Sequence, residues 1–444
     1  MTLDLAPLDL AVAFREHLAQ RQRDAEAALA ATGFDTLVIS SGQHFVYFAD
    51  DREASFYAVP HFLHWCPLEG PHHVIKVQPG RKPLLIRYAP EDFWYLQAPL
   101  GTPFWLDGFD LVECGTEEEV WKALGDCGRG AYIGEEVGRA EAAGFALNPE
   151  HLTKHLDWCR SFKSDYELAC ITEAQKLGAV GHRAAKAAFL DGASELEVHW
   201  AYVKAVGCVD EDLPYTTIVA LDAMGAILHY HGKRPQVRNG RVLLLDAGAR
   251  FHGYASDITR TWTAPHCDPR FAALAQSMEK TQQALCAMVK PGLHYGDFHQ
   301  QAHFLIGDIL LEHGILRNVS RDDAVHERLV KPFFPHGLGH HLGIQVHDVA
   351  GKQLNADGTP APQPPEHPFL RTTRMIEAGH VFTVEPGLYF IEMLLRPFRE
   401  NGHADKFNWR LIDALSPMGG IRIEDNVLVT SDGHRNLTRE YLPE

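Results

Sequence analysis

Several features are missing from this chain, and each absence narrows what the protein can be. The eight cysteines form no Cys-x-x-Cys pair, so we expect reduced, mostly structural thiols in a cytoplasmic protein. No apolar run approaches the roughly 18–20 residues that cross a bilayer, so no membrane span is expected. Lysine and arginine form no block, and the net charge of −17 argues against nonspecific binding to nucleic acid or an anionic membrane.

The length and the amino-terminal sequence set the broad class. A chain of 444 residues is too long for one ordinary core and predicts about two domains. Charged residues are 22% of the chain and hydrophobic residues 45%, a balance typical of a soluble globular protein. The amino-terminal segment carries acidic side chains and lacks a basic start followed by an apolar run, so no secretory signal is expected.

The pattern of helices and strands divides the chain near residue 160. Residues 1–160 alternate strands and helices, which predicts a small amino-terminal α/β domain. Ser164 and Glu167 have the spacing of a capping box at the start of a long helix. In residues 161–444 short turns join the strands, which predicts an α+β domain with an antiparallel sheet and flanking helices.

Two aspartates lie on neighbouring strand-like segments of the second domain. Asp246 follows three leucines in RVLLLDAGAR, and Asp257 lies in GYASDITRTW, with a short turn between the segments. A regular hairpin centred between residues 251 and 252 places the two aspartates opposite each other, with Cβ atoms about 4.5–5.5 Å apart. Unpaired carboxylates at that distance repel, whereas bound cations stabilise them. Solvated strand ends are the alternative, which the three leucines disfavour.

Two glutamates lie in similarly apolar segments. In GGIRIEDNVLVT the alternation places Glu424 on the same face as Arg422, so a salt-bridged outer face is an equal alternative to a metal site. Glu385 ends the apolar part of HVFTVEPGLYF just before Pro-Gly, where a solvated strand end is again the alternative. Buried carboxylates cost free energy unless positive charge neutralises them, and no comparable set of embedded lysines or arginines is present.

A glycine-rich segment contributes imidazoles to the same set. PHGLGHHLGIQVHD contains four histidines, and so many imidazoles in a glycine-rich turn favour a metal or substrate site over core packing. With 27 histidines in the chain, a histidine outside such a segment carries little weight. Carboxylates with one imidazole and no cysteine suit divalent ions such as Mn²⁺, Co²⁺ or Zn²⁺ in a hydrolytic two-metal centre.

Together these segments resemble the metal-dependent pita-bread peptidases. The ordered set DAG, SDITRTW, HGLGHHLGIQVHD, TVEPGLYF and GIRIEDN is most similar to the proline dipeptidases (prolidases), including the bacterial organophosphorus acid anhydrolases. The resemblance implies a pita-bread catalytic domain in residues 161–444 beside the smaller domain of residues 1–160. It also implies two divalent metal ions per subunit, with manganese expected and cobalt or zinc as alternatives.

The resemblance implies roles for individual residues. Asp246 is expected to bind one metal ion. The other ion is expected to be bound by His340 and Glu385, with Asp257 and Glu424 bridging both. The residues expected to assist catalysis are Glu385, as the proton carrier, and the histidines His229, His336 and His347. The residues expected at the substrate and metal site are Arg371, His347, Tyr215 and Arg422. His341 has no role in the pattern.

The resemblance further implies an activity. A hydroxide held between the metals is expected to hydrolyse dipeptides with a C-terminal proline, while the guanidinium of Arg371 holds the substrate carboxylate. A side activity on organophosphorus esters or fluorides is also implied. The alternatives are an Xaa-Pro aminopeptidase of the same fold acting on longer peptides, and a metal-free interaction scaffold, which the presence of all five ligands disfavours.

The aromatic segment 44–66 suggests a role beyond the small domain's core. In the related enzymes the amino-terminal domain mediates dimerisation and reaches the partner's active site. We therefore expect a homodimer and hypothesise that this segment, including Asp50 or Asp51, reaches the active site of the second subunit.

Overall fold

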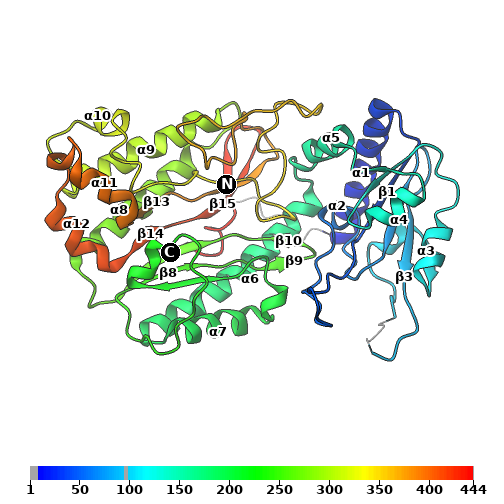
Figure 1. Cartoon of the computed structure of the whole chain (residues 1–444), viewed down its shortest axis with the longest axis horizontal. Helices are drawn as coiled ribbons and strands as arrows, with labels where there is room; N and C mark the ends of the chain where they lie inside the picture. Colours follow the sequence, from blue (N-terminus) through cyan, green and yellow to red (C-terminus); the bar gives the residue numbers. More distant parts are fainter. Residues whose placement is uncertain (1–8, 95–98, 444) are drawn as a thin grey trace. The chain divides into compact units, whose positions relative to one another are not determined.

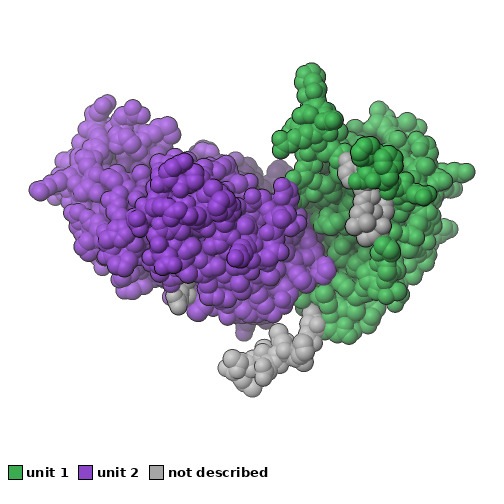
Figure 2. Space-filling model, turned by 90° about the horizontal axis from the view of Figure 1, so that it is seen from below, with its two compact units in different colours: residues 1–169, 355–359 green, residues 170–354, 360–444 purple. Residues whose placement is uncertain are grey.

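The computed structural model describes residues 9–94 and 99–443, and it divides into two compact units (Figures 1 and 2). Unit 1 comprises residues 1–169 with 355–359, and unit 2 comprises residues 170–354 with 360–444. Within the described ranges, no helix is both long enough and apolar enough to cross a membrane.

Unit 1 is built on a six-stranded mixed sheet with strand order β4-β3-β2-β1-β5-β6. The central strand β1 (Thr36–Ser40) is fully buried, antiparallel to β2 (Val74–Val77) and parallel to β5 (Gly130–Ile133). The other elements are β3 (Leu84–Tyr88), β4 (Asp110–Cys114), β6 (Ala146–Leu147), α1 (Leu10–Thr32), α2 (Pro60–Leu63), η1 (Leu106–Gly108), α3 (Glu117–Ala123), α4 (Val137–Ala142) and α5 (Glu150–Arg160). The expected α/β character of this part of the chain is confirmed.

Local sequence signals explain where the long helices begin and end. The Asp9 side chain accepts hydrogen bonds from the first backbone N–H groups of α1, and Gly33 ends the helix with φ +72°. The capping box that starts α6 (Asp165–Leu190) is present as expected. Ser164 N–H donates to Glu167 at 2.9 Å, and Glu167 N–H donates back to the Ser164 hydroxyl at 3.4 Å.

Unit 2 contains four small antiparallel sheets flanked by helices, with strand orders β11-β8-β7, β12-β15-β16, β13-β14 and β10-β9. The strands are β7 (Ile218–Leu221), β8 (Val242–Asp246), β9 (Arg250–Phe251), β10 (Tyr254–Ala255), β11 (Thr259–Thr263), β12 (Val381–Val384), β13 (Gly387–Tyr389), β14 (Gly420–Arg422), β15 (Asp425–Val429) and β16 (His434–Asn436). The helices after α6 are α7 (Glu195–Val206), η2 (Asp210–Asp212), η3 (Asp222–Ala226), α8 (Pro269–Met288), α9 (Tyr295–Glu312), α10 (Arg321–His326), α11 (Glu392–Glu400), η4 (Ala404–Lys406), α12 (Trp409–Leu415) and η5 (Ser416–Met418). The expected α+β architecture is confirmed.

The hairpin that carries the two aspartates has a different register from the expected one. Asp246 pairs with Thr259, and Phe251 pairs with Tyr254, so the turn is centred on His252 and Gly253. Both turn residues have positive φ (+47° and +86°), as a two-residue type I′ turn requires. The prediction that Asp246 and Asp257 face each other is therefore wrong. Because the shift is two residues, both side chains stay on the same face, as diagonal neighbours.

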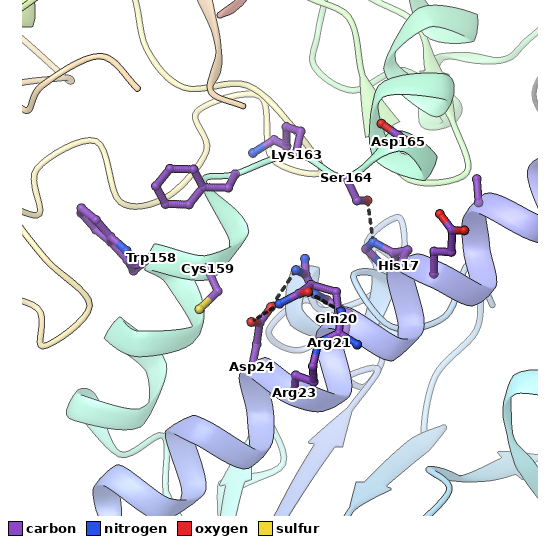
Figure 3. Close-up of a pocket in the computed structure, with 13 residues that line it drawn as sticks. His17, Gln20, Arg21, Arg23, Asp24, Trp158, Cys159, Lys163, Ser164 and Asp165 are labelled. Carbon is purple, nitrogen blue, oxygen red and sulfur yellow. Dashed lines mark hydrogen bonds and ion pairs between the residues drawn. The ribbon is translucent and has the colours of Figure 1, made fainter. Parts of the chain in front are cut away.

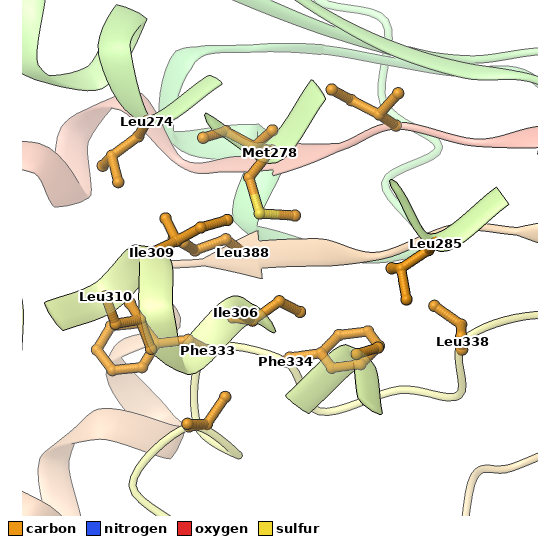
Figure 4. Packing of buried hydrophobic residues seen from close by; sticks show 14 of the residues in the cluster. Leu274, Met278, Leu285, Ile306, Ile309, Leu310, Phe333, Phe334, Leu338 and Leu388 are labelled. Carbon is orange, nitrogen blue, oxygen red and sulfur yellow. The ribbon is translucent and has the colours of Figure 1, made fainter. Parts of the chain in front are cut away.

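The core of unit 2 lies between two long helices and the strands that carry the site. The buried residues of α8 recur at helical spacing, at Phe271, Leu274, Met278 and Leu285. Figure 4 shows Leu274, Met278 and Leu285 gathered with the buried side chains Ile306, Ile309 and Leu310 of α9, Phe333, Phe334 and Leu338 of the following segment, and Leu388 of β13. Since each fully buried side chain of this size contributes roughly 1.5–3 kcal/mol, this packing holds the strand ends in place.

Candidate metal centre

Four carboxylates from separate strand ends converge within unit 2. Asp246 ends β8, Asp257 lies between β10 and β11, Glu385 lies between β12 and β13, and Glu424 lies between β14 and β15. Asp246, Asp257 and Glu424 are buried, with at most 9% of each residue exposed. The alternative of solvated strand ends is therefore wrong for Asp246 and Asp257.

Asp257 is fixed by its backbone as well as its side chain. Its N–H donates to Asn426 Oδ1 at 2.9 Å, and Asn426 Nδ2 donates back to the Asp257 carbonyl at 2.5 Å. The Tyr215 hydroxyl donates to Asp257 Oδ1 at 2.6 Å. One carboxylate oxygen, Oδ2, is thereby left to face His340.

Glu424 is joined to the hairpin and is not part of an outer face. Its N–H donates to the Thr259 carbonyl at 3.0 Å, and the Thr259 hydroxyl donates to Glu424 Oε2 at 2.6 Å. Arg422 is also buried, and it donates to Asp246 Oδ2 at 2.8 Å and to the Tyr389 hydroxyl at 3.0 Å. The salt-bridged outer face considered for Arg422 and Glu424 is therefore wrong.

The orientation of His340 makes one ring nitrogen available to the carboxylates. Its Nδ1 lies 3.0 Å from the His341 carbonyl oxygen, so Nδ1–H donates there and Nε2 is left to face the carboxylates. That Nε2 lies 3.4 Å from Asp257 Oδ2 and 3.6 Å from Glu385 Oε1. Ligand atoms of Asp257, His340 and Glu424 all lie within 4.8 Å of one another. A backbone carbonyl that fixes the tautomer in this way is common among metal-binding histidines.

Burial and mutual repulsion raise the pKa values of three of the four carboxylates. Burial, then repulsion by Asp257, Glu385 and Asp246, raises the pKa of Glu424 well above its ordinary value. Burial raises the pKa of Glu385 to about 7, against the attraction of His340 and Arg422. Burial also raises the pKa of Asp246. Burial acts in the same direction on Asp257, but hydrogen bonds from His340 and Tyr215 outweigh it and lower its pKa.

These residues fit divalent cations. Asp246 Oδ1 is buried and has no hydrogen-bond partner within residues 9–94 and 99–443. A buried carboxylate oxygen without a partner costs free energy that a bound cation would recover. The donor set is rich in carboxylate oxygen with one imidazole and no sulfur, which suits hard or borderline divalent ions.

The remaining predicted residues lie around this cluster. The ring centroid of His347 lies 4.3 Å from that of His340, and burial with the charges of His340 and Arg371 lowers its pKa to about 3. Burial is the main cause of the low pKa of His336 and of His347, and the charge of His229 adds to it in both. Tyr215 and Arg422 contact the cluster directly, as described above. Arg371 is exposed.

His336 differs from the other two histidines because both of its ring nitrogens are engaged. Nδ1 lies 2.8 Å from the Gly337 carbonyl oxygen, and Nε2 lies 2.9 Å from the Tyr389 hydroxyl. Nδ1–H therefore donates to the carbonyl, and Nε2 accepts from the tyrosine. In the described part of the chain, His229 and His347 make no hydrogen bond through their rings.

Sequence reasoning missed three residues that build the site: Thr259, Tyr389 and Asn426. The signal for Asn426 was present, because strand alternation places it on the same face as Glu424, two residues earlier. Thr259 likewise follows Asp257 by two residues. Tyr389 had no such signal, since only tertiary structure brings its hydroxyl to Arg422 and His336.

A cavity in unit 1 contains none of the predicted site residues. Its volume is about 530 Å³, and it lies between α1 and the segment 158–165 (Figure 3). Its polar side chains pair with one another, as Arg21 does with Asp24 at 2.7 Å and His17 Nδ1 with the Ser164 hydroxyl at 2.8 Å. The convergent carboxylates of unit 2 therefore remain the candidate site.

Comparison with known proteins identifies the class of this site. The model of metallopeptidase family M24 matches residues 169–431, which hold all the predicted metal ligands. The model of the Xaa-Pro dipeptidase N-terminal domain matches residues 12–158. The chain belongs to metallopeptidase family M24, and the pita-bread peptidase resemblance seen in the sequence is confirmed.

Individual relatives cover nearly the whole chain. An Xaa-Pro dipeptidase of Pseudoalteromonas atlantica is 44% identical over 438 residues, which are 97% of this chain and 98% of the relative. An Xaa-Pro dipeptidase of Pectobacterium atrosepticum is 41% identical over 437 residues, with the same coverage of both chains. Membership in this family of metal-dependent hydrolases implies divalent metal ions, for which the carboxylate cluster is the candidate site.

Solved structures show the same fold at low sequence identity. Aminopeptidase PepP of Pseudomonas aeruginosa superposes with a TM-score of 0.71 at 22% identity, covering 97% of this chain and 96% of that one. Aminopeptidase P from E. coli with the inhibitor Pro-Leu gives 0.71 at 21% identity, covering 96% and 95%. At this level of identity the likeness establishes the fold alone.

Proposed function

We propose that this protein is an Xaa-Pro dipeptidase that hydrolyses dipeptides with a C-terminal proline at a two-metal centre. The observation that carries the proposal is the convergence of four carboxylates and one imidazole at a site with too few cationic side chains to neutralise them. Asp246 Oδ1 is left there without a hydrogen-bond partner. The full-length similarity to proteins named Xaa-Pro dipeptidase supports the substrate class. The direct test is turnover of Ala-Pro by the chelator-treated protein, which should be lost and should return on addition of Mn²⁺.

We assign Asp246 to one metal, His340 and Glu385 to the other, and Asp257 and Glu424 to both. Manganese is the proposed ion, with cobalt or zinc as alternatives, because the donor set is mostly carboxylate oxygen. When bound, the two ions would activate a water molecule and polarise the carbonyl of the scissile bond.

The protein's own side chains would position the substrate and carry the proton. The Glu385 carboxylate is proposed to carry a proton to the prolyl nitrogen as the bond breaks. His229 and His347 have ring N–H groups free to donate to the developing oxyanion. We assign His336 a supporting role, because both of its nitrogens already hold Gly337 and Tyr389. Arg422 holds Asp246, and Tyr215 holds Asp257.

Arg371 is proposed to hold the substrate carboxylate and so to restrict the enzyme to dipeptides. Arg371→Ala should raise KM for Ala-Pro about 10–100-fold, since a hydrogen bond between charged groups is worth about 1.5–3 kcal/mol. Turnover of Ala-Pro-Ala, which offers no carboxylate at that position, should stay low and change little. Steady-state kinetics on both peptides provides the measurement, with Arg328→Ala as a control in the same unit. An unchanged KM for Ala-Pro would favour the alternative, an Xaa-Pro aminopeptidase acting on longer peptides.

We also propose a side activity on organophosphorus esters or fluorides. An electrophilic P=O group requires little from the site beyond activated water and a polarising cation. Hydrolysis of a fluorophosphate should therefore follow the same metal dependence as hydrolysis of Ala-Pro. Fluorophosphate hydrolysis that survives chelation would contradict the assignment to this centre.

Residues 1–160 are proposed to form a dimerisation domain, and residues 161–444 the catalytic domain. In support, the side chains of Phe45 and Phe48 are 65% and 100% exposed. Exposed apolar side chains that lie close together often mark an interface with another protein. The proposed occupant of this surface is the second subunit, whose active site Asp50 or Asp51 would reach.

The eight free cysteines agree with a reducing cytoplasm.

Phe48→Ser should shift the protein from dimer to monomer in sedimentation velocity experiments, because it removes the most exposed aromatic side chain of this surface. Trp200→Ser, at a half-exposed aromatic side chain on α7, is the matched control and should leave the dimer intact. A wild-type protein that sediments as a fully active monomer would refute the proposed dimer.

A further inference from the structure

Metal-capable side chains also gather outside the candidate metal centre. Among the residues that the structure describes, two such groups in unit 1 already contain a cationic side chain. Arg21 Nη1 lies 2.6 Å from His64 Nε2 and 3.6 Å from Glu167 Oε2, and Arg139 Nη2 lies 2.8 Å from Glu117 Oε2. A guanidinium thus takes the place of a metal ion in both, and neither group calls for a further ligand.

A third group, here called the histidine cluster, has no such cation within it and consists of His299, His303 and His367. His299 and His303 are buried and four residues apart on α9, so their side chains lie on the same face of the helix. His367 comes from the irregular segment that precedes Arg371, and it is half-buried. His299 Nε2 lies 3.0 Å from His367 Nδ1 and 3.3 Å from His303 Nε2.

Hydrogen bonding cannot satisfy all three nitrogens at once. A neutral imidazole offers one N–H and one in-plane lone pair, at different nitrogens. His367 Nε2 faces Gln300 Oε1 at 3.3 Å and donates to it, so its Nδ1 presents a lone pair. His299 Nε2 faces two nitrogens at once, and neither its lone pair nor its N–H can bond well to both. Three nitrogens that converge in this way are arranged as ligands of one ion.

The spacing and the surroundings fit a zinc ion. Tetrahedral zinc with Zn–N bonds of about 2.0–2.1 Å separates its nitrogen ligands by roughly 3.3 Å, close to the two distances observed. A cavity of about 10 Å³ adjoins the three rings, which is room for about one water molecule or ion. The charged groups at its edge are Lys331 and Glu366, which are of opposite sign. The half-buried position of His367 provides a route of entry.

We propose that the histidine cluster is a zinc site, separate from the candidate metal centre, in which His299 Nε2, His303 Nε2 and His367 Nδ1 bind one ion and leave a fourth position to water. Gln300 supports it by accepting the outer N–H of His367, the kind of contact that orients metal-binding histidines. The bound ion ties the segment that carries Arg371 to α9.

The test measures how many zinc ions each chain binds in a background variant that lacks the carboxylate centre. The protein carrying Asp257→Asn and Glu424→Gln is incubated with Zn²⁺, dialysed and analysed by mass spectrometry of the metal. This background should retain one zinc ion per chain, and X-ray absorption should show nitrogen ligands at about 2.0–2.1 Å. Adding His367→Asn should remove the ion, whereas adding His326→Asn, at an exposed histidine on α10, should not.

Two results would overturn the proposal: a background protein that holds no zinc, or zinc that persists after His367→Asn. His303→Gln serves as a second variant with the same expected loss, and circular dichroism establishes that each variant is folded. The comparison also separates this proposal from the proposed function. If the carboxylate centre binds no metal, Asp257→Asn with Glu424→Gln leaves the total metal content unchanged, whatever the histidine cluster does.

Discussion

Asp257→Asn is expected to lower kcat/KM for Ala-Pro by at least about 10³-fold, since polarisation by bound metals contributes several kcal/mol and each 1.4 kcal/mol is a factor of ten. Asparagine keeps the shape of the side chain and can still accept the hydrogen bond from Tyr215, so the fold should survive. Only the charge and the second oxygen proposed to bind metal are lost. Steady-state kinetics with added Mn²⁺, together with metal analysis of the same sample, provides the measurement.

The matched control is Asp297→Asn, which removes the same charge from an exposed position in the first turn of α9. It should leave kcat/KM within about twofold, as expected for a surface substitution. Glu424→Gln should behave like Asp257→Asn, because both side chains are proposed to bridge the metals. Near-normal turnover by either bridging variant would refute the two-metal centre and, with it, the proposed mechanism.

Acid is expected to unfold the protein between about pH 6 and pH 4, because several histidines are buried in the neutral form. Burial and the charge of Arg21 lower the pKa of His17 to about 4, and burial lowers the pKa of His73 to about 4 and of His182 to about 3. In the unfolded chain each binds a proton near its ordinary value of about 6.5. The unfolded state therefore binds more protons as the pH falls, and stability is lost in that direction.

The size of this effect is comparable with the whole stability of a domain. Below pH 6.5, each of these histidines lowers the free energy of unfolding by up to about 1.4 kcal/mol per pH unit. By pH 4 this amounts to about 3 kcal/mol for each histidine. Total stabilities are typically about 5–15 kcal/mol. Urea unfolding followed by circular dichroism at pH 7.5, 6.0 and 5.0 should show a steadily falling midpoint.

A substitution at one buried histidine separates the titration of these histidines from other effects of acid on stability. His73 accepts a hydrogen bond from the Tyr88 N–H and lies 3.1 Å from the Glu69 carbonyl, two contacts that a glutamine side chain can make without titrating. His73→Gln should therefore reduce the dependence of the midpoint on pH. His326→Gln, at an exposed site, should leave it unchanged. A midpoint that stays constant from pH 7.5 to 5.0 in the unsubstituted protein would contradict the prediction.

The metal-binding candidates could be predicted because each is marked by its immediate neighbours. Asp246 follows three leucines and Glu385 follows an apolar strand, so the neighbouring residues alone predict that both carboxylates are buried. The register of the hairpin could not be predicted in the same way. His252 and Gly253 moved the turn by one residue, and hence the pairing by two, because backbone φ values at the turn decide it.

The sequence by itself determined the two-part architecture, the antiparallel strands and the residue types that suit a metal centre, because these follow from short-range periodicity and local composition. Only the tertiary structure decided which partners those residues meet. Arg422 reaches Asp246 across 176 positions of the chain, and His367 reaches His299 across 68. Such contacts arise when strand ends and loops pack together, and nothing in the sequence near either residue specifies the distance between them.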